Sequence, residues 1–158
     1  YFYALKLLLE QNMDVRLDIY GAGNPEGLGL LRQLKYLYLS DFVTFKGHAD
    51  CIEDTLKQGG IDLVWFQSND SVPAGYAALE ITMSAIPQVF WDFSKMSQKN
   101  SIDKIFPSFT SITAFAEFSK EILKSIESRN ELGIAQRTFV ENHNSIQTHI
   151  HLFEELIN

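Results

Sequence analysis

The chain has 158 residues and a formal net charge of −7, and 46% of its residues are hydrophobic and 13% aromatic. This length suits a single domain that buries roughly two-thirds of the surface exposed in its unfolded form, and the apolar content excludes a disordered linker. With thirteen Lys and Arg scattered along the sequence, a nonspecific nucleic-acid binder is also excluded.

Strand and helix patterns alternate along the first 91 residues. Apolar residues recur at helical spacing from Tyr1, and alternating apolar and polar residues then lead into Gly21, which predicts a helix followed by a strand. The same succession recurs along the chain. The predicted elements are helix 1–9, strand 15–20, helix 25–39, strand 43–45, helix 49–58, strand 61–66, helix 74–84 and strand 87–91.

Residues 61–66 are almost continuously apolar, as in a parallel strand covered on both faces, so we expect a central strand there. Repeated strand-then-helix steps predict an α/β fold with a Rossmann-like, doubly wound parallel sheet. Residues 92–111 are predicted to form a loop with one helical turn, and the carboxyl-terminal tail is predicted to be helical at 113–128, 131–142 and 145–157. We expect one domain over 1–158.

Two glycines, Gly21 and Gly23, follow the first predicted strand. Glycine in this position lets a phosphate approach the backbone near a helix start. The third glycine of the dinucleotide-binding pattern would fall at Glu26, so an ordinary strand-to-helix turn is favoured over a dinucleotide site.

The most informative stretch runs from Asp62 to Pro87. A strand ends at Ser68, a helix opens near Gly75, and Glu80 follows about one and a half turns later on the surface that also carries Tyr76. This order resembles the carboxyl-terminal, donor-binding domain of retaining glycosyltransferases of the GT-B fold, family 4-like, which use nucleotide-sugar donors.

The resemblance extends to the first half of the chain. The Gly21–Gly23 turn matches a Gly-x-Gly turn of that family, and a second strand pattern is matched residue for residue. Its members here are Asp41, Val43, Phe45 and Gly47.

The resemblance implies a donor site. Backbone amides at Ala74, Gly75 and Tyr76 would hold the diphosphate, because a helix start offers free N–H groups and the positive end of the dipole. Glu80 would accept hydrogen bonds from the ribose hydroxyls. The implied donor-binding residues are Gly21, Gly23, Ser68, Gly75, Tyr76 and Glu80.

One departure from the family concerns the donor sugar. The family usually has a second glutamate eight positions before the one matched by Glu80, and Val72 stands there instead. Either Asp70 or Ser71 reaches the sugar, or sugar recognition is altered or absent. A noncatalytic GT-B-like subunit that binds a partner or glycan is therefore the alternative to an enzyme.

The implied function is sugar transfer, with retention and hexosyl donors expected, as in polysaccharide biosynthesis. No metal and no cofactor are expected, and the catalytic residues are not assigned. The chain is expected to be a fragment that lacks the amino-terminal domain and the first strand, a central one, so that a slot is left beside strand 61–66. It should bind a donor but hardly catalyse. The resemblance allows peripheral membrane association through the missing part.

Other residues point to no further chemistry. A single cysteine, Cys51, cannot form an internal disulfide, so a cytoplasmic location is expected. His48 is expected on the surface, and Trp65 and Trp91 in the core. His149 and His151 lie two apart in a predicted helix, which is poor metal geometry.

Overall fold

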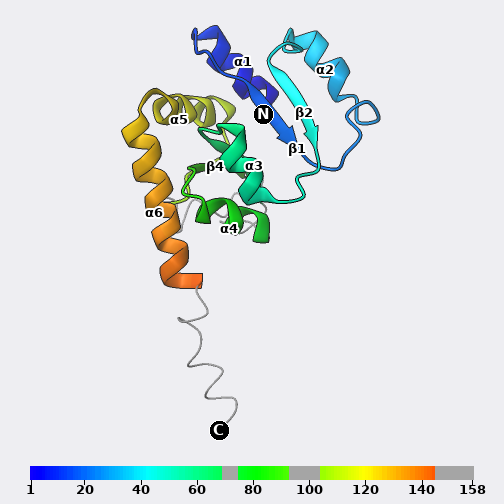
Figure 1. The fold of residues 1–158 in the computed structure, drawn as a ribbon. Helices are drawn as coiled ribbons and strands as arrows, with labels where there is room; N and C mark the ends of the chain where they lie inside the picture. The colour runs from blue at the N-terminus through cyan, green and yellow to red at the C-terminus, as the bar shows by residue number, and fades with distance from the viewer. Residues whose placement is uncertain (69–74, 93–103, 145–158) are drawn as a thin grey trace.

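The computed structural model describes residues 1–68, 75–92 and 104–144 (Figure 1). Helices and strands alternate as far as β4, and the chain then ends its described part in two helices. The elements are α1 (Phe2–Glu10), β1 (Leu17–Tyr20), α2 (Leu30–Leu37), β2 (Val43–Gly47), α3 (Ile52–Gly59), β3 (Val64–Ser68), α4 (Gly75–Met83), β4 (Gln88–Asp92), β5 (Ser108–Phe109), α5 (Ile112–Lys124) and α6 (Ile126–Asn144).

The strands form two parallel sheets, which confirms the predicted Rossmann-like α/β class. β1 pairs with β2, and a second sheet has the order β3-β4-β5. Within the described residues β4 is thus the middle strand, whereas β3, which we expected to be central, lies at an edge. Its apolar residues Val64, Trp65 and Phe66 are only half-buried, while Val89 and Phe90 of β4 are fully buried.

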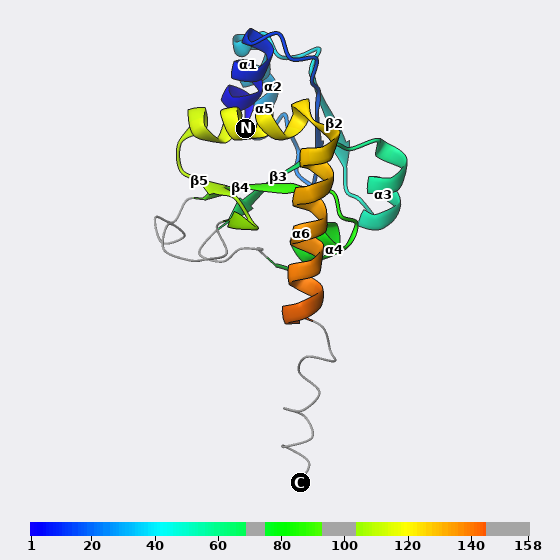
Figure 2. The same cartoon turned by 90° about the vertical axis from the view of Figure 1, so that its left-hand side faces the viewer.

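Both faces of the β3-β4-β5 sheet are covered by helices. On one face Val89 packs with Phe115 and Ala116 of α5 and with residues of α1, and on the other Phe90 packs with Ala78 of α4 and Val140 of α6. Figure 2 shows α5 and α4 on opposite sides of these strands. This two-sided cover follows from the continuous apolar pattern of a parallel strand, whose successive side chains point to opposite faces.

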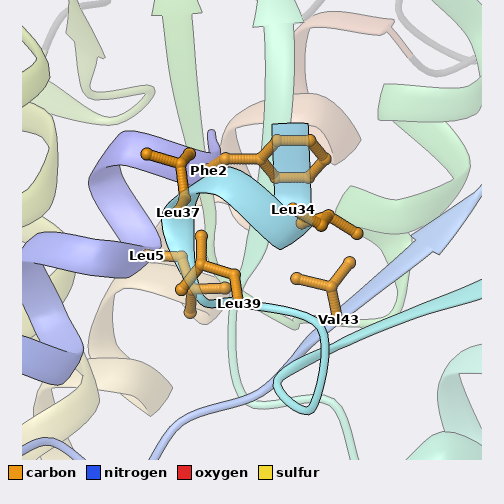
Figure 3. Close-up of a cluster of buried hydrophobic side chains, with 6 residues drawn as sticks. All are labelled: Phe2, Leu5, Leu34, Leu37, Leu39 and Val43. Atoms are coloured by element: carbon orange, nitrogen blue, oxygen red, sulfur yellow. The ribbon is translucent and has the colours of Figure 1, made fainter. Parts of the chain in front are cut away.

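Another cluster of buried apolar residues joins α1 and α2 to the β1-β2 sheet (Figure 3). Each helix contributes apolar residues from one face. Leu39, which follows α2, and Val43, the first residue of β2, complete the cluster. Trp65 of β3 packs against the same cluster, so the two sheets share a continuous core. The buried members are Phe2, Leu5, Leu34, Leu37, Leu39 and Val43.

Helix α2 is shorter than predicted. We expected a helix over 25–39, but α2 starts at Leu30 because Gly29 has a left-handed backbone with φ 68°. Residues 25–29 form a turn, and before it the side-chain Oδ1 of Asn24 accepts from the Glu26 N–H at 3.0 Å. Asn side chains commonly offer the backbone this local alternative to a helix.

The carboxyl-terminal segment also differs from the prediction. The break expected between 128 and 131 occurs at Ser125, which is extended and whose hydroxyl accepts from the Ser128 N–H at 3.1 Å, so it caps α6. The two-residue strand β5 lies inside the stretch that we predicted to be a loop. The helix predicted at 145–157, with His149 and His151, lies outside the described residues.

The two tryptophans are half-buried and belong to an aromatic group around Phe115, close to their predicted core positions. The ring of Trp65 lies 5.1 Å from that of Phe115, and the Trp65 Nε1–H donates to Ser119 Oγ at 3.0 Å. Ser119 is fully buried, so its hydroxyl is the acceptor that the indole N–H would otherwise find in water.

A Ser119→Ala substitution should therefore lower the free energy of unfolding by about 1 kcal/mol, because the indole N–H loses its acceptor. Urea unfolding followed by tryptophan fluorescence measures this. Thr138→Ala, at an exposed position of α6, is the control and should change stability by less than about 0.5 kcal/mol. Equal stabilities of the Ser119→Ala and parent proteins would contradict the assignment.

Candidate functional site

The carboxyl ends of β1 and β2 form an exposed backbone edge. The N–H of Gly21, the residue after β1, donates to the carbonyl of Gly47, the last residue of β2, at 2.7 Å. Gly21 has φ 156° and Gly47 has φ 76°, and a Cβ added to either would meet no atom within 4 Å. The two glycines thus meet backbone requirements rather than packing ones, and they leave open space beside the main chain.

The Gly21–Gly23 turn does not lead directly into a helix. Because α2 begins only at Leu30, the expectation that this turn immediately precedes a helix start is wrong. Gly23 is exposed, and a Cβ on it would lie at an ordinary contact distance of 3.8 Å from Leu28 Cδ1. The amides available here are those of the turn itself, without the aligned dipole of a helix.

A helix start of the predicted kind occurs at α4. Gly75 is its first residue, is exposed, has φ 72°, and has open space where a Cβ would be. The first turn carries no acidic side chain. Its leading amides have no partner within the helix, as at any helix start, and a nearby anion would be favoured. The residues that connect β3 to α4, including Asp70, Ser71 and Val72, lie outside the described residues.

Helix α4 has one buried face and one exposed face. Ala78, Ile81 and Thr82 are buried, whereas Tyr76 is 86% exposed and Glu80 is also exposed. Tyr76 and Glu80 are four residues apart and therefore share a face of the helix. Glu80 is thus not a core residue. Among the described residues, no hydrogen bond joins Glu80 to the Gly21 turn, so the structure brings Gly75, Tyr76 and Glu80 together on α4 and Gly21 with Gly47 on the other sheet.

Ser68 is the last residue of β3 and lies opposite Asp92, the last residue of β4. Asp92 is only 2% exposed, and no motif in the sequence marks it as a site residue. We ended the predicted strand at Trp91, so the aspartate fell into the predicted loop. The signal that could have found it is its position, since carboxyl ends of neighbouring parallel strands share the sheet edge where α/β proteins bind ligands.

Two ion pairs show where charge lies relative to these strand ends. Lys46 Nζ lies 3.3 Å from Asp18 Oδ2, and Lys46 directly precedes Gly47, so a half-exposed cation stands near the Gly21–Gly47 edge. At the opposite end of β3, Asp62 Oδ1 lies 3.4 Å from Arg129 Nε of α6. Asp62, one of the residues that carry the resemblance, therefore makes a surface contact away from the strand's carboxyl end.

Other features of the site concern histidine, metals and membranes. His48 is exposed in the segment after β2, as expected. The described residues contain no group of three or more His, Cys, Asp or Glu side chains arranged to hold a metal ion. Within the same residues, no helix combines the length and apolar character that crossing a bilayer requires.

Comparison with known proteins identifies the fold. No family model and no curated protein matches the chain. Among solved structures, TarM from S. aureus, in a complex with fondaparinux, alpha-GlcNAc-glycerol and UDP, aligns with 99% of this chain at a TM-score of 0.76 and 16% identity. Sucrose-phosphate synthase from Thermosynechococcus elongatus aligns with 99% at 0.72 and 16% identity, and WaaG, a glycosyltransferase involved in lipopolysaccharide biosynthesis, with 90% at 0.67 and 16% identity.

The chain therefore has the fold of a GT-B glycosyltransferase domain, as the resemblance implied. It spans only part of these proteins, namely 32% of the TarM chain, 41% of the synthase chain and 38% of the WaaG chain. Identities this low show a shared fold.

Proposed function

We propose that this chain is the donor-binding domain of a glycosyltransferase whose donor is a nucleotide-diphosphate-sugar. The transferred sugar is proposed to be a hexose, and transfer is proposed to retain the configuration at the anomeric carbon. The observation that carries the proposal is the start of α4, where an exposed left-handed glycine opens a helix whose solvent face presents Tyr76 and Glu80. The GT-B fold supports it at the level of architecture.

The proposed roles follow from the charge of the ligand. A diphosphate is anionic, and the amides of Gly75 and Tyr76 would neutralise part of that charge at the positive end of α4. Glu80, more than a turn along the same helix, would accept hydrogen bonds from the ribose hydroxyls. Ser68 and the backbone of Gly21 and Gly23 would line the remaining edge. The proposal assigns no role to a metal or cofactor, since backbone amides at a helix start can hold an anionic group themselves.

Ligand-observed saturation-transfer NMR tests the proposal. UDP is the first probe, because it is named in the TarM complex, and GDP and ADP follow. Saturation transfer to the ribose and base protons of one of these nucleotides is expected. If the complete protein that carries this chain bound none of the three at millimolar concentration, the proposal would fail.

Transfer itself needs a partner domain. The proposed partner is an amino-terminal GT-B domain, which would close over the donor and bring the acceptor, since proximity and exclusion of water supply much of the catalytic effect. Among the described residues β3 pairs only with β4, and its half-buried apolar residues support a further parallel strand beside it, the proposed first strand of this domain. The isolated chain is expected to bind nucleotide without measurable transfer.

Val72 favours a second candidate, a noncatalytic GT-B-like subunit that retains the fold to bind a partner or glycan. The valine side chain cannot accept a hydrogen bond from a sugar hydroxyl, and in this candidate donor recognition stops at the nucleotide. The two candidates differ in a measurable way. An enzyme transfers or hydrolyses a bound nucleotide-sugar in the complete protein, whereas the noncatalytic subunit binds at most the nucleotide part.

A Val72→Glu substitution tests whether the sugar contact has been lost. If it has, the substitution should raise the affinity for UDP-glucose or UDP-GlcNAc by roughly three- to tenfold relative to UDP, the value of one new hydrogen bond. Isothermal titration of both ligands gives the ratio. Ser71→Glu adds the same charge one position away and should leave the ratio unchanged. An unchanged ratio in Val72→Glu would show that this position does not face the sugar.

A further inference from the structure

Helix α6 lies directly on the turn that joins α4 to β4. Gly133 is buried on α6, and a Cβ built there would lie 1.9 Å from the carbonyl oxygen of Ala85 and 3.3 Å from the nitrogen of Pro87. Ala85 itself has a left-handed backbone with φ 58°. No other residue fits at this point of α6, because only glycine lets the two backbones approach so closely.

One turn further along α6, Gln136 holds the first residue of β4. Its side chain is fully buried. Oε1 accepts from the Gln88 N–H at 2.8 Å, and Nε2 donates to the carbonyl oxygens of Gln88 and Ile105, both at 2.8 Å. Both polar atoms of this side-chain amide bond to backbone atoms, so α6 is fixed relative to the start of β4.

The hydrogen bonds continue from β4 into α4. The Gln88 side-chain Nε2 donates to Thr82 Oγ1 at 2.6 Å and to the Ala78 carbonyl at 2.9 Å. Thr82 Oγ1 in turn donates to the Ala78 carbonyl at 2.7 Å. These groups are fully buried, and they link the inner face of α4 through β4 to α6.

Stability alone does not explain why these buried positions carry polar, hydrogen-bonded side chains. The Gln88 Oε1 atom is buried and has no hydrogen-bond partner among the described residues, which costs free energy. Apolar side chains of similar size would fill the space without that cost. Directional bonds do what apolar contacts cannot, since they fix how far α4 slides and rotates against the sheet.

We propose that Gly133, Gln136, Gln88 and Thr82, here called the α6 clamp, are positioning residues for the nucleotide site. By fixing α4 along its buried face, the clamp fixes where the Gly75 amide and the Glu80 carboxylate stand on its exposed face. The inference rests on the proposed function for its binding consequence, and it assigns to α6 a role in ligand affinity although α6 contributes no proposed ligand contact.

The test compares variants that cut the clamp with variants that spare it. Thr82→Val keeps the shape but removes the hydroxyl, and Gln136→Leu removes the contacts to β4. Both should weaken UDP binding at least fivefold. Thr82→Ser restores the hydroxyl and should bind within twofold of the parent protein. Val43→Ala, a core truncation at the start of β2 away from α4, controls for general destabilisation and should also stay within twofold.

Two measurements, UDP affinity and backbone amide resonances, decide whether the clamp positions the site. Unchanged UDP affinity in folded Thr82→Val protein, or an equal loss in Val43→Ala, would overturn the proposal. The second readout is the pair of backbone amide resonances of Gly75 and Tyr76, which should shift in Thr82→Val but not in Thr82→Ser. If the parent protein bound no nucleotide, the proposed function would fail independently of the clamp. If the Gly75 and Tyr76 amide resonances did not shift in Thr82→Val, the clamp would be shown not to position α4.

Discussion

Replacement of Glu80 by alanine is expected to weaken nucleotide binding by roughly 1.5 to 3 kcal/mol, which is about tenfold to more than a hundredfold in Kd. The reason is that a carboxylate accepts strong, charge-assisted hydrogen bonds from hydroxyl groups, and alanine leaves those hydroxyls without an acceptor in the bound state. Because Glu80 is exposed on α4, the fold should be unaffected. Titration calorimetry with the nucleotide that binds the parent protein measures the loss.

Glu80→Gln grades the effect, since the amide keeps one acceptor oxygen and should lose less affinity than alanine. Glu131→Ala is the matched control, because it removes one negative charge from an exposed helical position on α6. It should leave the affinity within twofold. A Glu80→Ala protein that binds UDP as tightly as the Glu131→Ala protein would remove Glu80 from the site and leave the α4 proposal without its ribose contact.

The alternation of strands and helices as far as β4 could be predicted because these elements have a clear apolar pattern. The continuous apolar run before Ser68 predicted a parallel strand, which β3 is, although it lies at a sheet edge and is only half-buried, and the helix expected at 74–84 is found at Gly75–Met83. The same periodicity predicted correctly that Glu80 would lie on the outer face of that helix with Tyr76. Patterns of this kind depend on local spacing, which the sequence displays directly.

Local backbone chemistry explains most of the differences. Nothing in the apolar spacing of residues 25–39 shows that Gly29 adopts a left-handed conformation, and that one residue sets the start of α2. The strand β5 has two residues, too few for any period, and is held by pairing with β4. Ser125 ends α5 in an extended conformation, although the surrounding residues have helical spacing.

Long-range contacts were beyond prediction for a different reason. Gln88 and Gln136 are separated by 48 residues, and in a single sequence each is an ordinary polar residue expected at the surface. Their burial becomes reasonable only when α6 lies on the α4–β4 turn. Asp92 is a similar case, because its position opposite Ser68 follows from strand register and not from any motif. The roles of Gly21, Gly23, Ser68, Gly75, Tyr76 and Glu80 in donor binding remain predictions.

A Gly133→Ala substitution is expected to lower the free energy of unfolding by about 2 to 3 kcal/mol, as overpacking of a close contact does, with a fall in Tm of roughly 5 to 10 °C. Helix propensity alone favours alanine by about 1 kcal/mol, so the expected sign is opposite to that of an ordinary helical glycine. The clash decides it. The added methyl would lie 1.9 Å from the Ala85 carbonyl oxygen, a backbone atom that no side-chain rotation can remove.

Relief of this contact requires α6 to move away from the α4–β4 turn by about 1.5 Å, given ordinary contact distances of 3.5 Å or more. Such a displacement stretches the Gln136 hydrogen bonds to Gln88, which stand at 2.8 Å, and so opens the α6 clamp. Calorimetric or urea unfolding of Gly133→Ala beside Ala135→Leu, a larger change at an exposed position of the same helix, isolates the contact. A Gly133→Ala protein more stable than its parent would mean that α6 does not approach Ala85 so closely, and the clamp would then lose its anchor on the turn.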